Sequence, residues 1–305
     1  MGIAEGPAWS IMTALIEESS DPSRRGRNIG IVVSAAALVG LAVAPVLTTQ
    51  VAARFGWRWA FFVAGVPGIV AGLLIWKFVK EPPRNSTPAI HGHAVHIRDF
   101  LSILRYRNIW LCCAGAAGFI SWLFLVNVFA PLYITEVAHQ TPTTAGFLLG
   151  ATGLGSFVLG LLLPTLSDRW GRKPILMLAA VMSTFVPIAL MLSPLYAYPW
   201  LLAALLFVAN AGQVMPTLVM VLVPTESVPA QFAATSIGLA TFVGEIIGAT
   251  LAPTLGGALA ETHGLGITLL MAAAGSVLVL LAALFLKETA NVRRGNGELL
   301  PSPEA

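Results

Sequence analysis

Charged residues are scarce in this sequence. Asp, Glu, Lys and Arg make up 10% of the 305 residues, while hydrophobic residues make up 57%. Soluble domains carry roughly 25% charged residues, so this composition argues against a soluble enzyme. Cysteine is scarce too: Cys112 and Cys113 are adjacent in an apolar run and form neither a disulfide framework nor a metal-binding pair. A secreted disulfide-rich module is therefore excluded as well.

Long apolar stretches make up most of the sequence. A bilayer core of ~30 Å needs about 20 apolar residues in a helix. Six of the stretches contain no charged residue, and the others contain one each, namely Glu5, Arg58 and Glu245. The nine stretches are 1–16, 28–53, 57–76, 109–135, 143–166, 174–196, 199–224, 232–260 and 264–286. The sequence predicts an all-α, polytopic helical membrane protein with about nine transmembrane helices.

The basic residues predict its orientation. If the connections alternate between the two membrane faces, one face receives 15 of the 17 Lys and Arg, and the other receives only Arg54 and Arg58. The basic face takes residues 17–27, 77–108, 167–173 and 287–305. Cytoplasmic connections are rich in Lys and Arg, so we expect this face and the C-terminus to be cytoplasmic. We expect a bacterial inner membrane protein.

An internal repeat predicts the domain organisation. With an offset of 208 residues, 18–47 and 226–255 share eight identities in thirty, and Gly40 and Pro45 align with Gly248 and Pro253. Parallel repeats of two halves are a known transporter plan. The second half is complete at 109–286, and the first would lack three helices, so we expect helices 4 to 12 of a twelve-helix protein. The expected parts are an incomplete first half (1–76), a cytoplasmic linker (77–108), the second half (109–286) and a cytoplasmic tail (287–305).

Several segments carry a family resemblance. Ser167-Asp168-Arg169-Trp170-Gly171-Arg172-Lys173 is similar to the D-R-x-G-R-[RK] loop motif of the major facilitator superfamily. Glu18 with Arg24, Arg25, Gly26 and Arg27 resembles its loop between helices 4 and 5. Residues 2–8 and 55–61 resemble helix 4 and the helix 5–6 connection of its anion:cation symporter branch. The resemblance implies the twelve-helix fold and a gating role for Glu18, Arg27, Asp168, Arg169, Gly171, Arg172 and Lys173.

The loop motif also has a physical interpretation. Asp168 can accept hydrogen bonds from backbone N–H groups at a nearby helix start, and the basic residues can pair with acids or lipid phosphates. Such contacts can hold helices together in one conformation and release them in another. An ordinary basic cytoplasmic loop is the alternative.

Two carboxylates lie within apolar stretches. A carboxylate at mid-membrane costs about 2.5–3.5 kcal/mol on insertion scales, so it should face a cavity, find a partner or take up a proton. Symporters of the resembled branch use a helix 4 acid for proton coupling, which makes Glu5 a candidate; Glu245 could titrate or bind the substrate. A packing role is the alternative for each, because both are flanked by glycines. Gly40, Pro45, Gly248 and Pro253 are candidate helix bends.

Three amides, Asn127, Asn210 and Gln213, are candidates for the substrate cavity. An interhelical hydrogen bond is the alternative for each of them. His91, His93 and His96 lie in the Pro-containing linker, which we interpret as a solvated loop rather than a metal site. No metal, cofactor or nucleic-acid site is expected; the expected partners are a small solute, protons and the lipid bilayer, and the expected state is a monomer.

These observations predict secondary active transport by alternating access, specifically proton-coupled symport of a small organic anion. Two alternatives stay open at this point. One is a proton-coupled exporter of drugs or metabolites, which the direction of proton flux would distinguish from a symporter. The other is a truncated remnant that does not transport.

Overall fold

The structure is a computed structural model that describes residues 35–78, 103–229 and 232–289, and these residues form helices and short connections without any strand. Eight helices in them are long and apolar enough to cross a membrane. They correspond to the last eight of the nine predicted stretches; the first stretch, 1–16, lies outside the described residues. The prediction of a polytopic helical membrane protein is confirmed.

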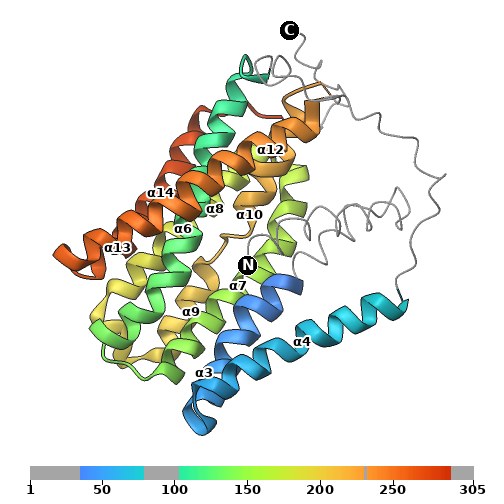
Figure 1. Ribbon diagram of the computed structural model, residues 1–305. Coiled ribbons are helices and arrows are strands. Elements are labelled where there is room, and N and C mark those ends of the chain that lie inside the picture. Colours follow the sequence, from blue (N-terminus) through green and yellow to red (C-terminus); the bar gives the residue numbers. More distant parts are fainter. Residues whose placement is uncertain (1–34, 79–102, 230–231, 290–305) are drawn as a thin grey trace.

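The described residues form two packed parts (Figure 1). The N-terminal hairpin consists of η1 (Ala37–Val43), α3 (Ala44–Phe55) and α4 (Trp57–Phe78). The C-terminal bundle contains the remaining elements: α6 (Arg107–Leu132), η2 (Tyr133–Val137), α7 (Pro142–Trp170), α8 (Arg172–Met191), η3 (Ser193–Ala197), α9 (Pro199–Ala209), α10 (Val214–Pro216), η4 (Thr217–Leu222), α11 (Val223–Glu226), α12 (Ala233–Gly244), η6 (Glu245–Leu251), α13 (Ala252–His263) and α14 (Gly266–Phe285).

Helix α6 lies at the centre of the C-terminal bundle and packs against α14, α12 and η6. Small residues allow these close approaches. A Cβ atom added at Gly118 of α6 would lie 2.5 Å from the Gly275 carbonyl oxygen on α14, and one at Gly248 of η6 would lie 2.6 Å from the Ser121 nitrogen on α6. Backbone thus meets backbone at both crossings.

The repeat predicted from the sequence has a structural counterpart. With the same offset of 208 residues, the π-helical segment η1 aligns with η6, and α3 aligns with α13, at identical bounds. Both α-helices have proline in the first turn and end at a glycine with positive φ, Gly56 at 90° and Gly264 at 78°. Glycine tolerates this conformation because it has no Cβ atom. The four predicted bend residues therefore lie where a π-helical segment passes into an α-helix, a geometry often found at functional sites.

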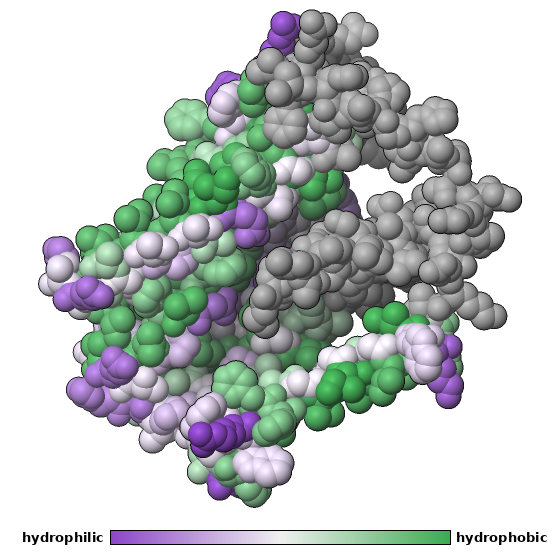
Figure 2. All heavy atoms as spheres, viewed as in Figure 1, coloured by the Kyte–Doolittle hydropathy of each residue, from purple (hydrophilic) through white to green (hydrophobic). Residues whose placement is uncertain are grey.

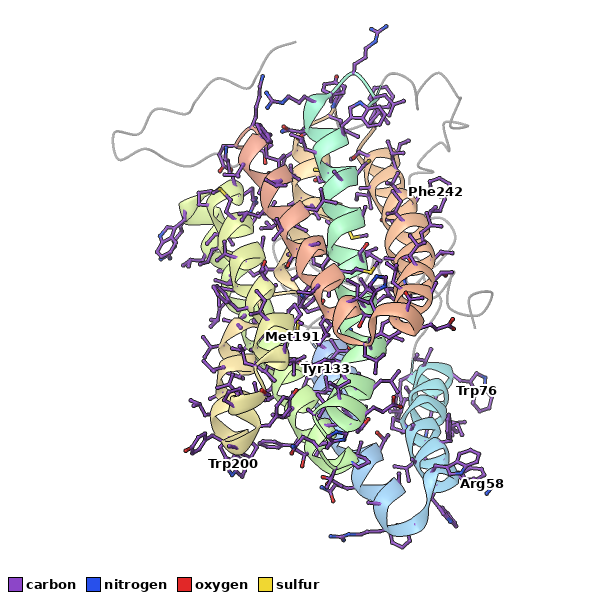
Figure 3. All side chains as sticks on the ribbon, turned by 90° about the vertical axis from the view of Figure 1, so that its left-hand side faces the viewer. Arg58, Trp76, Tyr133, Met191, Trp200 and Phe242 are labelled. Carbon is purple, nitrogen blue, oxygen red and sulfur yellow. The ribbon has the colours of Figure 1, made fainter. Side chains whose placement is uncertain are left out.

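The aligned helices differ strongly in burial. In α14, 50% of the most apolar window is buried, whereas none of the corresponding window of α4 is. Figure 2 shows apolar spheres along most of α4, and in Figure 3 Arg58 and Trp76 point away from the bundle. Trp76 is 84% exposed. Helix α14 is buried because it packs against both α6 and α8, whereas α4, among the described residues, packs mainly against α3.

The hairpin contacts the bundle through α7. Both η1 and α3 pack against this helix, which presents Gly146, Gly150 and Gly153 on one side. A Cβ at Gly150 would lie 2.5 Å from Val46 and 3.0 Å from the Ala42 carbonyl oxygen, and a Cβ at Gly153 would overlap the backbone of Leu41. The two backbones therefore touch, and nothing larger than glycine fits at these positions.

Candidate functional site

The predicted loop motif lies at the turn between α7 and α8. Helix α7 ends at Trp170, Gly171 follows with φ 102°, and α8 begins at Arg172. Glycine is required here for two reasons: the backbone is in a conformation that side chains disfavour, and a Cβ would lie 2.6 Å from a carboxylate oxygen of Glu288. The turn thus brings the start of α8 against the segment that follows α14.

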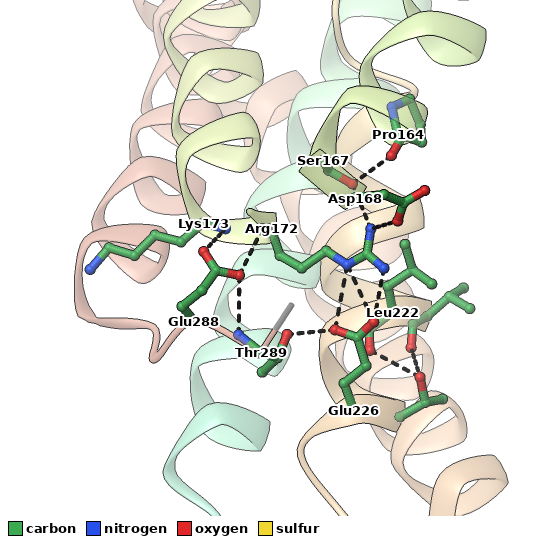
Figure 4. Close-up of polar contacts among 11 residues, drawn as sticks. Pro164, Ser167, Asp168, Arg172, Lys173, Leu222, Glu226, Glu288 and Thr289 are labelled. Carbon is green, nitrogen blue, oxygen red and sulfur yellow. Dashed lines mark hydrogen bonds and ion pairs between the residues drawn. The ribbon is translucent and has the colours of Figure 1, made fainter. Parts of the chain in front are cut away.

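Arg172 is the centre of a polar cluster (Figure 4). Its Nη1 atom lies 2.5 Å from Asp168 Oδ1 and donates to Ser167 Oγ at 2.7 Å, and its Nη2 atom lies 2.9 Å from Glu226 Oε1. The side chain of Arg172 is only 11% exposed, so charge-assisted hydrogen bonds compensate for its burial. The guanidinium therefore joins the α7–α8 turn to the end of α11.

Glu288 and Thr289 connect a third segment to this cluster. The Glu288 carboxylate accepts hydrogen bonds from the backbone N–H of Arg172 (2.8 Å) and of Lys173 (3.1 Å), and Thr289 Oγ1 donates to Glu226 Oε2 at 2.6 Å. The first N–H groups of a helix have no partner within it, and a carboxylate satisfies them well. We call Ser167, Asp168, Arg172, Glu226, Glu288 and Thr289 the Arg172 network.

The structure refines the expected role of the motif residues. Asp168 was the expected acceptor for N–H groups at a helix start, but Glu288 takes that place at α8, and Asp168 pairs with the Arg172 side chain instead. Lys173 donates from Nζ to the Leu284 carbonyl at 2.7 Å. Arg169 is exposed. Glu18 and Arg27, the other predicted members, lie outside the described residues.

The Arg172 network can act as a releasable tie. It joins the ends of α7, α8, α11 and α14 on one side of the bundle through charged groups at a half-buried site. Removing the acids would leave the buried guanidinium of Arg172 uncompensated, typically at a cost of about 3–5 kcal/mol. A movement that hydrates all partners together avoids that cost.

The mid-span candidates lie in several environments. Glu245 begins η6, is exposed, and its carboxylate makes no hydrogen bond or ion pair with a described residue. Asn127 is exposed on α6, and its Nδ2 donates to the Leu123 carbonyl of its own helix at 2.8 Å. Gln213 is half-buried beside Gly160 of α7. Glu5, the other predicted carboxylate, lies outside the described residues.

Asn210 lies at a break in a transmembrane helix. The candidate span Pro199–Glu226 is interrupted between Ala209 and Val214, near its middle. Asn210 Nδ2 donates to the Thr152 carbonyl on α7 at 3.0 Å, and its Oδ1 accepts the Gly212 N–H at 3.2 Å. It is 5% exposed. Asn210 thus makes an interhelical hydrogen bond, the alternative interpretation for this residue, and also satisfies the Gly212 N–H within the break.

Sequence reasoning missed five residues that matter here. Glu288 and Thr289 follow the last apolar stretch after one residue, Lys287, and an acid at that place, on the same side as the loop motif, was the available signal. Asn108 at the start of α6 gave no signal. The Gly146-xxx-Gly150 pattern in α7 is a recognised signal for close helix packing in membranes and could have predicted the contact with the hairpin.

Fold and site together define a polytopic helical membrane protein with two related parts and a charged loop network at one side of the bundle. The sequence matches the Major Facilitator Superfamily over residues 1–249, and the chain belongs to that family. The resemblance seen in the loop motifs is therefore confirmed. The members of this family are transporters rather than enzymes.

The identity to individual relatives is low, between 25% and 29% for three of them. The chain is 28% identical over 263 residues to the probable 4-methylmuconolactone transporter of Cupriavidus pinatubonensis, covering 81% of this chain and 58% of the relative. It is 29% identical over 264 residues to the cis,cis-muconate transport protein of Acinetobacter baylyi, covering 82% and 62%. A probable L-galactonate transporter of Escherichia coli is 25% identical over 174 residues, covering 50% and 38%. The match thus spans about three fifths of the length of the first two relatives.

Proposed function

We propose that the protein is a secondary active transporter that moves a small organic anion together with protons by alternating access. The observation that carries this proposal is its similarity to two transport proteins named for cis,cis-muconate and 4-methylmuconolactone, over four fifths of the chain. The basic residues support an inner-membrane orientation with residues 287–305 in the cytoplasm.

A solute site near the middle of the membrane is supported by local irregularity of the helices. Irregular backbone at membrane depth is tolerated only where protein buries it or a cavity hydrates it, and broken helices are the usual pointer to a transporter's site. Here the span Pro199–Glu226 breaks at 210–213, and Glu245 begins a π-helical segment. Asn127, Gln213 and Glu245 are the polar groups that we assign to the cavity, with Asn210 supporting the break.

The repeat supports the assignment of Glu245. At the offset of 208 residues it aligns with Ala37, which is 5% exposed within η1, the segment that packs against α7. Gly248, three residues on, meets α6 instead. In the first repeat, the position of Ala37 lies in the segment that contacts the C-terminal bundle. Glu245 occupies the corresponding position in the second repeat. A carboxylate there would experience the change in hydration that alternating access requires.

The Arg172 network supports a gating role for the loop motif. It ties four segments on the side that the basic residues mark as cytoplasmic. We propose that it holds the cytoplasmic ends of the C-terminal bundle together in one conformation and opens in the other. At the offset of 208 residues Glu18 aligns with Glu226, and we assign Glu18, with Arg27 from the same loop, to the corresponding gating contact of the first repeat.

Uptake measurements test the proposal. Cells that lack endogenous muconate transport and express the complete gene should accumulate radiolabelled cis,cis-muconate or 4-methylmuconolactone with saturable kinetics, and a protonophore should abolish the accumulation. A neutral sugar serves as the control solute. Accumulation of both anions equal to that of cells with empty vector, with the protein present in the membrane, would contradict the proposal.

Glu5→Gln is expected to abolish proton-driven uptake while leaving membrane insertion intact. Glutamine keeps the size and hydrogen bonding of the side chain but cannot bind and release a proton. Uptake should fall by at least ~100-fold, as expected when a required proton-transfer group is lost, with an unchanged amount of protein in the membrane. Unaltered uptake with an unaltered pH dependence would assign Glu5 to helix packing.

A further inference from the structure

The segment after α14 is held by a side chain from the start of α6. Asn108 Oδ1 accepts the backbone N–H of Lys287 at 3.1 Å, and Asn108 Nδ2 donates to the Lys287 carbonyl at 3.3 Å. One amide thus pairs with both polar groups of a single backbone residue. Nδ2 also lies 3.0 Å from Ser227 Oγ, directly after α11. Asn108 is 8% exposed, so water does not readily replace these bonds.

Lys287 is followed by the two residues that complete the Arg172 network. Glu288 caps the start of α8 through the N–H groups of Arg172 and Lys173, and Thr289 donates to Glu226. Neither residue belongs to a helix, since α14 ends at Phe285. Their placement therefore depends on how the backbone at Lys287 is fixed.

Helix capping does not explain Asn108. The N-cap residue of α6 is Tyr106, and no side chain caps that helix end. Both polar atoms of Asn108 bond to segments more than a hundred residues away in sequence. A buried amide that satisfies other segments in this way specifies their arrangement.

We propose that Asn108 is a positioning residue of the Arg172 network: by pairing with the backbone of Lys287 it holds Glu288 at the start of α8 and Thr289 against Glu226. Because Asn108 is also the last residue of the linker predicted at 77–108, it connects the linker to the network. The placement of Glu288 and Thr289 by Asn108 is independent of the proposed function. The consequence that the network controls opening rests on that function.

Hydrogen–deuterium exchange tests the placement without any transport assay. The N–H groups of Arg172 and Lys173 are at the first positions of α8 and, among the described residues, their acceptor is Glu288. In the full chain in nanodiscs, Asn108→Ala should increase exchange in a peptide covering 168–174 on the order of tenfold, since charge-assisted hydrogen bonds are lost. Exchange within the interior of α8 should be unchanged.

Matched variants separate positioning from packing. Asn127→Ala removes an amide from the same helix whose hydrogen bond, among the described residues, lies within α6, and should leave exchange at 168–174 unaltered. Glu288→Ala should reproduce the effect of Asn108→Ala, and the double variant should add nothing further, because both changes remove the same contacts. Additive effects, or unchanged exchange in Asn108→Ala, would overturn the proposal.

Asn108→Asp keeps the test decisive if the alanine variant fails to fold. Aspartate has the same shape and keeps the acceptor for the Lys287 N–H, but it places oxygen against the Lys287 carbonyl. Exchange at 168–174 should then lie between that of the wild type and that of Glu288→Ala. Exchange equal to that of the wild type would contradict the positioning role, whatever the uptake measurements show.

Discussion

Replacing Gly153 by leucine is expected to detach the N-terminal hairpin from the C-terminal bundle. Even a Cβ at this position would overlap the backbone of Leu41 in η1, and a backbone cannot turn aside as a side chain can. Overpacking a close contact costs about 3 kcal/mol or more when nothing flexible can give way. Since η1 and α3 meet the bundle through α7, no other strong contact among the described residues would hold the hairpin in place.

Spin-label distances measure this effect directly. Labels at Ile69→Cys on α4 and Leu161→Cys on α7 occupy exposed sites, whereas the native Cys112 and Cys113 are buried. In nanodiscs the original protein should give one narrow distance distribution, and Gly153→Leu should give a broad one. Gly238→Leu is the matched control, because a Cβ there meets no atom within 4 Å. An unchanged narrow distribution in Gly153→Leu would show that the halves do not depend on this contact.

The second large effect is expected for Arg172→Ala. The substitution removes the guanidinium that now bonds both Asp168 and Glu226 and leaves these two acids without their shared partner. A loss of about 1.5–3 kcal/mol, the scale of hydrogen bonds to a charged group, corresponds to a fall in the midpoint of thermal unfolding of roughly 3–12 °C for a part of this size. Thermal unfolding in detergent, followed by tryptophan fluorescence, measures the change.

Arg169→Ala is the matched control for this prediction. It removes the same charge from the same turn, but Arg169 is exposed and makes no hydrogen bond or ion pair with a described residue. Its midpoint should stay within about 1–2 °C of the original protein, as expected for a surface charge. Equal effects of the two substitutions would mean that net charge, rather than the Arg172 network, determines stability here.

Local sequence signals predicted the architecture well. Apolar length predicted the eight candidate spans that the described residues contain, and the repeat at an offset of 208 residues reappears as matching element bounds in η1, α3, η6 and α13. These bounds follow from nearby residues: an Ala-Pro pair opens each α-helix and a glycine with positive φ closes it. Such determinants lie within a few positions of their effect, so a single sequence reveals them.

Contacts between distant segments were harder to predict. The carboxylate that caps α8 comes from Glu288, more than a hundred residues from Arg172. The amide that positions Glu288 comes from Asn108, at the start of the first helix of the C-terminal bundle. The helix break at 210–213 depends on Thr152 in α7 and on Trp122, whose ring lies against Gly212. Periodicity and composition carry no information about which segments meet in this way.

The direction of substrate-dependent proton movement tests the central claim most directly. Cells expressing the complete gene are suspended in unbuffered medium, and cis,cis-muconate is added while the external pH is recorded. Proton-coupled symport predicts alkalinisation of the medium that saturates with muconate concentration, is absent with a neutral sugar, and disappears in Glu5→Gln. Acidification on addition of muconate, or no change in pH while muconate accumulates, would contradict proton symport.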